Sequence, residues 1–233
     1  MKSYDLLANF YDRLIIDQGT IQPWIDFTAE YGNPGSLLEL ACGSGIMTLE
    51  FLKAGYQVTA LDLSAQMLEQ AAIKTKGYPI LYHLSDMRDF HFTKKFDTIV
   101  CFNDSLNYLT DLKDVERVFD LAYQHLKPDG CLLFDVHTTA RLKEFSEEFV
   151  EEGYIDDTPY QWCISAEDNS LYHTITFYQD NIPSTEQHVQ TVFTKAAIKS
   201  SLTRSGFNYL VFTDFNKTEK SRGEKWFFAA RRR

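Results

Sequence analysis

The sequence predicts an α/β fold with a mostly parallel sheet, and the stretch around residue 40 is the strongest basis for it. An apolar run over residues 37–40 leads into a glycine turn over 43–45, and an amphipathic helix over 46–52 follows. A second apolar run over 57–61 ends at Asp62, 19 residues after the first glycine of the turn. This order, with a spacing of roughly 20 residues, is typical of nucleoside-binding βαβ units.

The turn and the acid predict where a nucleoside would lie. A Cβ atom at Gly43 or Gly45 would keep the backbone away from a ligand, so glycine favours a close approach. Asp62 stands at the carboxyl end of the second strand, where it can accept hydrogen bonds from both hydroxyls of a ribose. We therefore expect the ligand at this edge of the sheet.

The residues around the turn favour S-adenosylmethionine over a dinucleotide. The third glycine of a dinucleotide fingerprint is replaced by Thr48. No Lys or Arg lies in the turn to meet a phosphate, and Glu39 stands just before it. A carboxylate there would repel a pyrophosphate but attract an ammonium or a sulfonium.

Further runs make the chain resemble the class I S-adenosylmethionine-dependent methyltransferases of the small-molecule type. The matching runs are 39–45, 61–64 with Met67, Leu68 and Ala71, 85–87, 96–100 and 126–134, in the order of the family. The resemblance implies a Rossmann-like, seven-stranded, mostly parallel sheet whose last strand is antiparallel. It also implies S-adenosyl-L-methionine as cofactor and S-adenosyl-L-homocysteine as product.

By the same resemblance, Asp86 would accept from the adenine amino group while the backbone at Met87 meets the ring, although Asp86 could equally cap a turn. The segment over 4–31 predicts a pair of short helices, which either pack on the sheet or form a lid with Tyr11 as an aromatic wall. The expected cofactor-binding residues are Tyr11, Glu39, Ala41, Gly43, Gly45, Asp62, Leu63, Met67, Asp86, Met87 and Asn103.

The remaining core elements follow along the chain. Ser64 is a suitable N-cap for the helix that contains Met67. We expect further strands over 80–84, 96–101, 130–136, 208–213 and 226–230, and helices over 112–126 and 194–205. The methyltransferase core therefore comprises residues 1–136 and 194–233.

Residues 137–193 depart from this minimal fold as an insert after the fifth strand. A helix rich in glutamate, containing Glu144 and Glu151, is expected first. Period-two runs then predict antiparallel strands over 160–164, 171–178 and 187–193, with turns at 169–170 and 182–184. We interpret this antiparallel β-layer as a lid over the substrate, with a dimerisation surface as the alternative.

Methyl transfer is an in-line displacement in which the protein mainly aligns the reacting groups. His137, just past the fifth strand, is the best candidate for a general base, although it could simply point to solvent. Asn107 and Tyr108 follow the fourth strand and are candidates for the acceptor pocket. The run 103–106 lacks the Asp-Pro-Pro-Tyr pattern of enzymes that methylate nucleic-acid or protein nitrogens, which favours a small-molecule acceptor.

Composition narrows the partners. The net charge of −10 argues against nucleic acid, which binds largely through Lys and Arg. The four cysteines form no C-x-x-C pair and the histidines show no metal-ligand spacing, so no disulfide framework and no metal are expected. Without an apolar signal core or a membrane-length apolar run, the chain is expected to be cytoplasmic, as a monomer or a homodimer.

The sequence therefore predicts an S-adenosylmethionine-dependent methyltransferase acting on a small molecule. An RNA methyltransferase, tRNA included, is one alternative, and it is weakened by the acidic balance. A non-catalytic sensor or scaffold that binds S-adenosylmethionine is the alternative from another class. An NAD-dependent reductase is disfavoured by Thr48 and Glu39.

Overall fold

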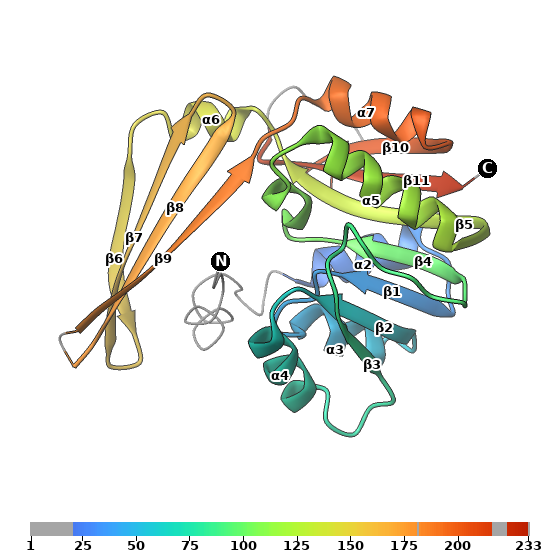
Figure 1. Cartoon of the computed structure of the whole chain (residues 1–233), viewed down its shortest axis with the longest axis horizontal. Helices are drawn as coiled ribbons and strands as arrows, with labels where there is room; N and C mark the ends of the chain where they lie inside the picture. The colour runs from blue at the N-terminus through green and yellow to red at the C-terminus, as the bar shows by residue number, and fades with distance from the viewer. Residues whose placement is uncertain (1–20, 181, 216–222, 233) are drawn as a thin grey trace.

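The computed structural model describes residues 21–180, 182–215 and 223–232. These residues form a seven-stranded sheet flanked by helices and a separate four-stranded sheet (Figure 1). The predictions for the leading segment, including Tyr11 as a cofactor contact, fall largely outside the described residues, apart from a helix that begins at Gln22.

The larger sheet has the predicted topology. Its strands are β1 (Ser36–Leu40), β2 (Gln57–Asp62), β3 (Leu81–Leu84), β4 (Phe96–Cys101), β5 (Leu126–His137), β10 (Phe207–Thr213) and β11 (Lys225–Arg232). They lie in the order β10-β11-β5-β4-β1-β2-β3. Strands β1 to β5 pair in parallel, whereas β11 runs antiparallel to both β5 and β10. The predicted antiparallel last strand is thereby confirmed.

Helices cover both faces of this sheet. They are α2 (Gln22–Tyr31), α3 (Ile46–Lys53), α4 (Ala65–Lys74), α5 (Leu112–His125) and α7 (Lys195–Arg204), with a short 3-10 helix η2 (Ser105–Tyr108). Because side chains alternate along a strand, Leu38 and Leu40 pack in one apolar cluster with residues of α5 and α7. Leu37 packs in a second cluster with α2 and α3. Burial on both faces explains the continuously apolar strands.

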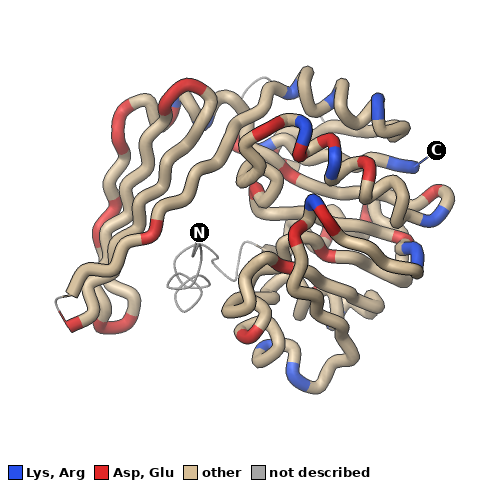
Figure 2. Tube along the Cα trace, in the orientation of Figure 1, with Lys and Arg blue, Asp and Glu red and all other residues tan. Residues whose placement is uncertain are grey.

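The insert forms a second sheet. A short helix α6 (Ala140–Glu144) is followed by β6 (Phe149–Ile155), β7 (Thr158–Glu167), β8 (Ser170–Gln179) and β9 (Ile182–Thr191). These four antiparallel strands, here called the arm, extend away from the larger sheet (Figure 1). The arm carries acidic side chains along its length and no Lys or Arg (Figure 2).

Two predictions for the insert were wrong. The glutamate-rich helix ends at Glu144, and Glu151 lies in β6 instead. Phe149, Val150, Tyr154 and Ile155 favour an extended conformation there, and pairing with β7 satisfies the backbone. The turn expected at 182–184 belongs to β9, where proline is tolerated because the strand lies at the edge of its sheet.

Candidate functional site

A cavity of about 620 Å³ lies at the carboxyl ends of the central strands, which is where open α/β sheets bind ligands. Its lining comes from the glycine turn, the ends of β2 and β3, the start of α4 and the segment after β4. The predicted residues among the lining are Ala41, Gly43, Asp62, Leu63, Met67, Asp86, Met87, Asn103 and Tyr108. The structure thus brings together most of the predicted cofactor set.

Asp62 holds the glycine turn and the start of α4 in place. Its Oδ2 accepts a hydrogen bond from the Gly43 N–H at 2.8 Å, and its Oδ1 accepts one from the Ser64 N–H at 2.9 Å. Ser64 in turn caps α4, as predicted, because its Oγ accepts from the Met67 N–H at 3.2 Å. Burial raises the pKa of Asp62. An ionised carboxylate has about four acceptor positions, so acceptor capacity remains for a ribose beside these backbone N–H groups.

The two glycines of the turn have different reasons to be glycine. Gly43 lines the cavity and has a φ of +54°, so it combines a left-handed backbone with a close approach to the ligand space. Gly45 also has a positive φ, but it lines neither cavity in the described part of the chain. A Cβ atom at Gly45 would lie 2.6 Å from the Cβ of Ala71 on α4. Packing of α3 against α4 therefore requires glycine at this position, and its predicted contact with the cofactor stays a prediction.

Glu39 lies in a small recess beside the main cavity, next to Ala41 and Asn103. The side chain is buried, and its Oε2 accepts a hydrogen bond from the Thr48 hydroxyl at 2.5 Å. Burial raises the pKa of Glu39 to about 8, despite the opposing effect of that hydrogen bond. A buried carboxyl of this kind is suited to receive an ammonium group. Thr48 orients the Glu39 carboxyl through this hydrogen bond, whereas the sequence analysis used Thr48 only to exclude a dinucleotide.

The end of the cavity near Asp86 shows an arrangement that the sequence did not suggest. Asp86 lines the cavity, but Arg88 grips its carboxylate through Nε and Nη2, the latter at 2.6 Å. Arg88 also pairs with Asp114 at 2.9 Å, and its guanidinium lowers the pKa of Asp86. The role of Asp86 as an acceptor for adenine stays a prediction, because Arg88 already uses part of its capacity.

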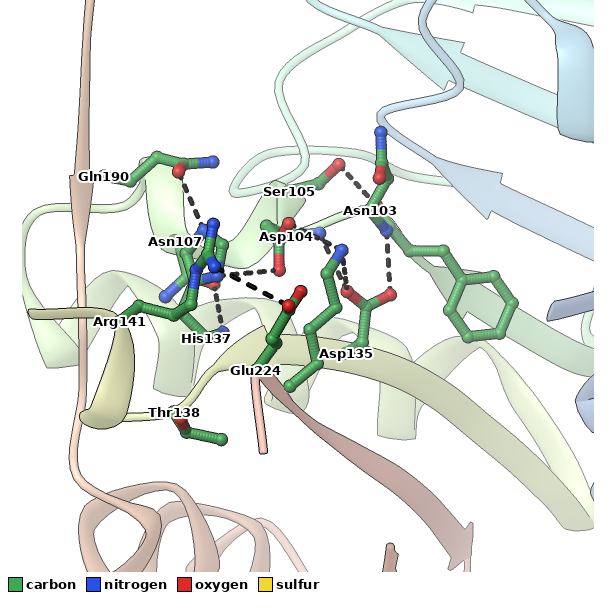
Figure 3. Close-up of polar contacts among 12 residues, drawn as sticks. Asn103, Asp104, Ser105, Asn107, Asp135, His137, Thr138, Arg141, Gln190 and Glu224 are labelled. Carbon is green, nitrogen blue, oxygen red and sulfur yellow. Dashed lines mark hydrogen bonds and ion pairs between the residues drawn. The ribbon is translucent and has the colours of Figure 1, made fainter. Parts of the chain in front are cut away.

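The segment after β4 is shaped by a buried carboxylate from β5. Asn103 and Asp104 both have a φ of +58°, which is unfavourable for residues with a side chain. Asp135 accepts hydrogen bonds from the backbone N–H groups of both, at 2.8 and 3.0 Å (Figure 3). It also accepts one from the Trp24 indole at 3.0 Å. The carboxylate therefore fixes the segment that leads to η2.

Lys225 balances this buried charge. Its Nζ lies 2.7 Å from Asp104 Oδ2 and 3.3 Å from Asp135 Oδ2. Burial would lower the pKa of Lys225, but the two carboxylates raise it, so the ammonium form is held. Although burial opposes it, His137 and Lys225 lower the pKa of Asp104. Sequence reasoning missed Lys225, since no motif marks it.

His137 is buried, so the alternative that it points to solvent was wrong. Its Nε2 lies 2.9 Å from Gln190 Oε1, and its Nδ1 lies 3.4 Å from Asp104 Oδ1 (Figure 3). It lines neither of the two cavities. The ring thus links β5 to the arm, and its role as general base stays a prediction.

The neighbouring residues Asn107 and Tyr108 have different environments in the structure. Asn107 is fully buried, with Oδ1 accepting from the His137 N–H and Nδ2 donating to the Thr191 carbonyl. The two ends of its amide join η2 to β5 and β9. Asn107 therefore positions these elements and does not line either cavity. Tyr108 lines the cavity and packs edge-on against His188 of β9.

Two further properties bear on what the site can do. In the described ranges, no group of three or more His, Cys, Asp or Glu side chains is arranged to hold a metal ion. Likewise, none of the helices described is both long enough and apolar enough to cross a membrane.

Comparison with known proteins gives concordant matches. A family described as "Methyltransferase domain" matches residues 37–130. The putative methyltransferase YqeM of Bacillus subtilis (strain 168) is 34% identical, with 98% of this chain and 97% of that protein aligned. The crystal structure of an S-adenosylmethionine-dependent methyltransferase from Clostridium acetobutylicum ATCC 824 is 26% identical, with 98% of each chain covered and a TM-score of 0.84.

A more distant similarity concerns one part of the chain. A dTDP-4-amino-2,3,4,6-tetradeoxy-D-glucose N,N-dimethyltransferase of Saccharopolyspora spinosa is 37% identical over 101 residues. The matched segment is 43% of this chain and 39% of that protein.

Proposed function

Because this chain belongs to the class I S-adenosylmethionine-dependent methyltransferases, we propose that it transfers a methyl group to an amino nitrogen of a small molecule. The observation that carries the proposal is the continuous cavity that runs from Asp62 past Asn103 to Tyr108. One end of it suits a nucleoside, and the other borders the arm.

The residues present fit the cofactor. Asp62 would hold the ribose hydroxyls, while the backbone around Gly43 would lie against the ligand. Glu39 would receive the ammonium group of the methionine part, next to Asn103. When bound, S-adenosylmethionine supplies an electrophilic methyl group on a sulfonium. The protein contributes orientation, which in well-aligned reactions lowers a barrier by roughly 7–11 kcal/mol.

The acceptor would lie beside Tyr108, where η2 meets the arm. Tyr108, which lines this end of the cavity, contacts His188 of β9, so the insert packs behind this part of the wall. This position supports the predicted lid role of residues 137–193. Loops and inserts of this kind vary between enzymes that share a core, and they commonly determine the acceptor.

Charge and similarity favour an amine as the acceptor. The site and the arm are rich in carboxylates, which attract an ammonium and repel phosphate-rich RNA. The Saccharopolyspora spinosa relative is named as an N,N-dimethyltransferase of an amino sugar nucleotide. The partly apolar cavity lowers the pKa of such an amine, whereas the nearby carboxylates raise it, and the neutral nitrogen is the form that attacks the methyl group.

The test is binding followed by transfer. Calorimetry should show that the protein binds S-adenosylmethionine and does not bind NAD. Asp62→Ala should weaken the affinity for S-adenosylmethionine at least tenfold, whereas Glu69→Gln, on the exposed face of α4, should leave it unchanged. Transfer is then measured by mass spectrometry with dTDP-amino sugars and glycine, using the sugar nucleotides with a hydroxyl in place of the amino group as controls. Methylation of the hydroxyl compounds alone, or of tRNA alone, would contradict the proposal.

A further inference from the structure

The charge of the protein is strongly segregated. Residues 144–194 contain eleven Asp and Glu residues and no Lys or Arg. The rest of the chain holds 22 acidic and 23 basic residues, so it is nearly neutral. In Figure 2 the arm shows acidic positions along its length, whereas both signs mix over the larger sheet and its helices. The net charge of −10 therefore belongs to residues 144–194, which include the arm, and is not an average over the surface.

The two faces of the arm differ in burial. One face carries Leu171, Ile175 and Phe177 of β8, all at most 1% exposed. Among the described residues of that face, only Phe149 and Ile182, at the ends of their strands, are large apolar residues that are exposed. The opposite face, here called the outer face, carries Val150, Tyr154, Tyr172, Tyr178 and Val189, which are all exposed. Large exposed side chains gathered on one side of a sheet mark it as an interaction surface.

A row of four residues crosses the outer face near its far end. Tyr154 lies opposite Pro159, and Tyr178 lies opposite Pro183. Tyr160 pairs with Phe177; Pro159 directly precedes Tyr160 and Tyr178 directly follows Phe177, so both lie on the side opposite to the buried Phe177. The side chain of Tyr154 is 74% exposed and that of Tyr178 is 37% exposed.

Acidic residues frame this row. Asp156 and Asp157 form the β6–β7 turn directly after the strand that carries Tyr154, and Asp180 follows β8 just beyond Tyr178. The two tyrosines stand two strands apart, roughly 10 Å at the usual strand spacing. Tyrosine faces attract guanidinium and ammonium groups, and neighbouring carboxylates strengthen that preference.

We propose that the outer face of the arm is a docking surface for an arginine- and lysine-rich segment of another protein. Tyr154 and Tyr178 would stack on its cationic side chains, and Asp156, Asp157 and Asp180 would pair with them. The absence of any Lys or Arg between residues 144 and 194 disfavours a second copy, since two such arms repel each other. The same sign of charge disfavours RNA and anionic membranes.

The test uses the full chain and defined probes. Fluorescence anisotropy is measured with labelled peptides of six Arg-Gly, six Lys-Gly or six Glu-Gly repeats, at low and at physiological salt. We expect micromolar binding of the arginine peptide, weaker binding of the lysine peptide and none of the glutamate peptide. Tyr154→Ser with Tyr178→Ser should weaken binding at least tenfold, and so should Asp156→Asn with Asp157→Asn and Asp180→Asn.

Matched variants separate this surface from diffuse charge. Asp26→Asn with Glu69→Gln and Asp89→Asn removes three exposed acids from the core, and Tyr78→Ser removes an exposed core tyrosine. These should change the affinity less than twofold. Equal losses in core and arm variants, or no binding of the arginine peptide, would overturn the proposal. A dimer in sedimentation that Tyr154→Ser with Tyr178→Ser dissolves would also overturn it, by assigning the face to a second copy.

Discussion

Asp135 Oδ1 and the backbone N–H of Asn103 form a hydrogen bond of 2.8 Å that connects the end of β5 to the segment after β4. Asn103 holds a left-handed backbone, which is uncommon for a residue with a side chain, although asparagine tolerates it better than most. The conformation persists because the buried carboxylate compensates it. Since Asn103 borders both the main cavity and the recess of Glu39, this contact shapes the centre of the site.

Replacing Asp135 with Asn should destabilise the protein and distort the site. An amide accepts through one atom only, whereas the two carboxylate oxygens serve Trp24, Asn103, Asp104 and Lys225. We expect a loss of about 2–4 kcal/mol in the free energy of unfolding, measured with urea. Asp120→Asn, at an exposed position on α5, is the control and should change it by less than about 0.5 kcal/mol. Similar effects of the two variants would contradict this role of Asp135.

Alanine at Gly45 should cost more stability than alanine at Gly55. Both glycines have a φ near +85°, with values of +81° and +90°, so each substitution brings about 1–2 kcal/mol of backbone strain. At Gly55 nothing lies within 4 Å of the added Cβ, but at Gly45 it meets Ala71. Overpacking adds roughly 1–3 kcal/mol there. Urea unfolding of Gly45→Ala and Gly55→Ala measures the two losses in the free energy of unfolding. Equal losses would contradict the prediction, because they would show that α4 shifts to accept the added Cβ at no cost in stability.

Binding of S-adenosylmethionine at pH 7 should release protons from Glu39, if the cofactor lies as proposed. Burial raises the pKa of this carboxyl to about 8, so it is largely protonated in the free protein. An ammonium group beside it favours the ionised form, and the affinity should therefore rise with pH up to about 8. Calorimetry in phosphate and in Tris should give different enthalpies. Glu39→Gln should remove the difference and Glu69→Gln should retain it, whereas identical enthalpies for the unaltered protein would contradict the assignment.

Stability should fall as the pH drops from about 6.5 to about 4, partly because of His173. Burial lowers the pKa of this histidine to about 4, whereas the unfolded chain binds the proton near 6.5. The unfolded state therefore binds more protons in this window. The contribution of His173 to the stability of the folded state is complete above pH 6.5 and is lost as the pH falls toward 4. The shift corresponds to an upper limit of about 3 kcal/mol.

Urea unfolding at pH 7 and pH 4.5 measures this dependence. His173→Gln should show a smaller drop between the two pH values than the unaltered protein, since the neutral side chain no longer titrates. His91→Asn, at an exposed position, should keep the full drop. If His173→Gln shows the same drop as the unaltered protein, another group causes the acid sensitivity.

The geometry around the glycine turn could be predicted because its contacts depend on short stretches of chain. The turn from Gly43, the cap at Ser64 and the position of Asp62 all belong to one βαβ unit. A unit of this kind closes its own hydrogen bonds, so residue type and spacing were sufficient. The seven-stranded sheet followed for the same reason, since its strands are apolar runs separated by recognisable turns and helices.

The other half of the site depends on residues that are far apart in sequence. Asn107 joins Thr191, which is 84 residues away, and His137 joins Gln190, 53 residues away. Neither partner belongs to a motif. These contacts depend on the register of β9 and on how the arm packs against η2. The identity of a polar residue does not reveal its partner before the backbone of both elements is placed.

The sequence by itself determined the family, the topology of the larger sheet, the cofactor and the acidic character of the insert. Only the tertiary structure decided which polar residues became buried partners, such as Lys225 with Asp135, and which face of the arm was left open. The physical reason is that local propensity and spacing act over one or two elements, whereas burial and charge pairing are settled when distant elements pack together.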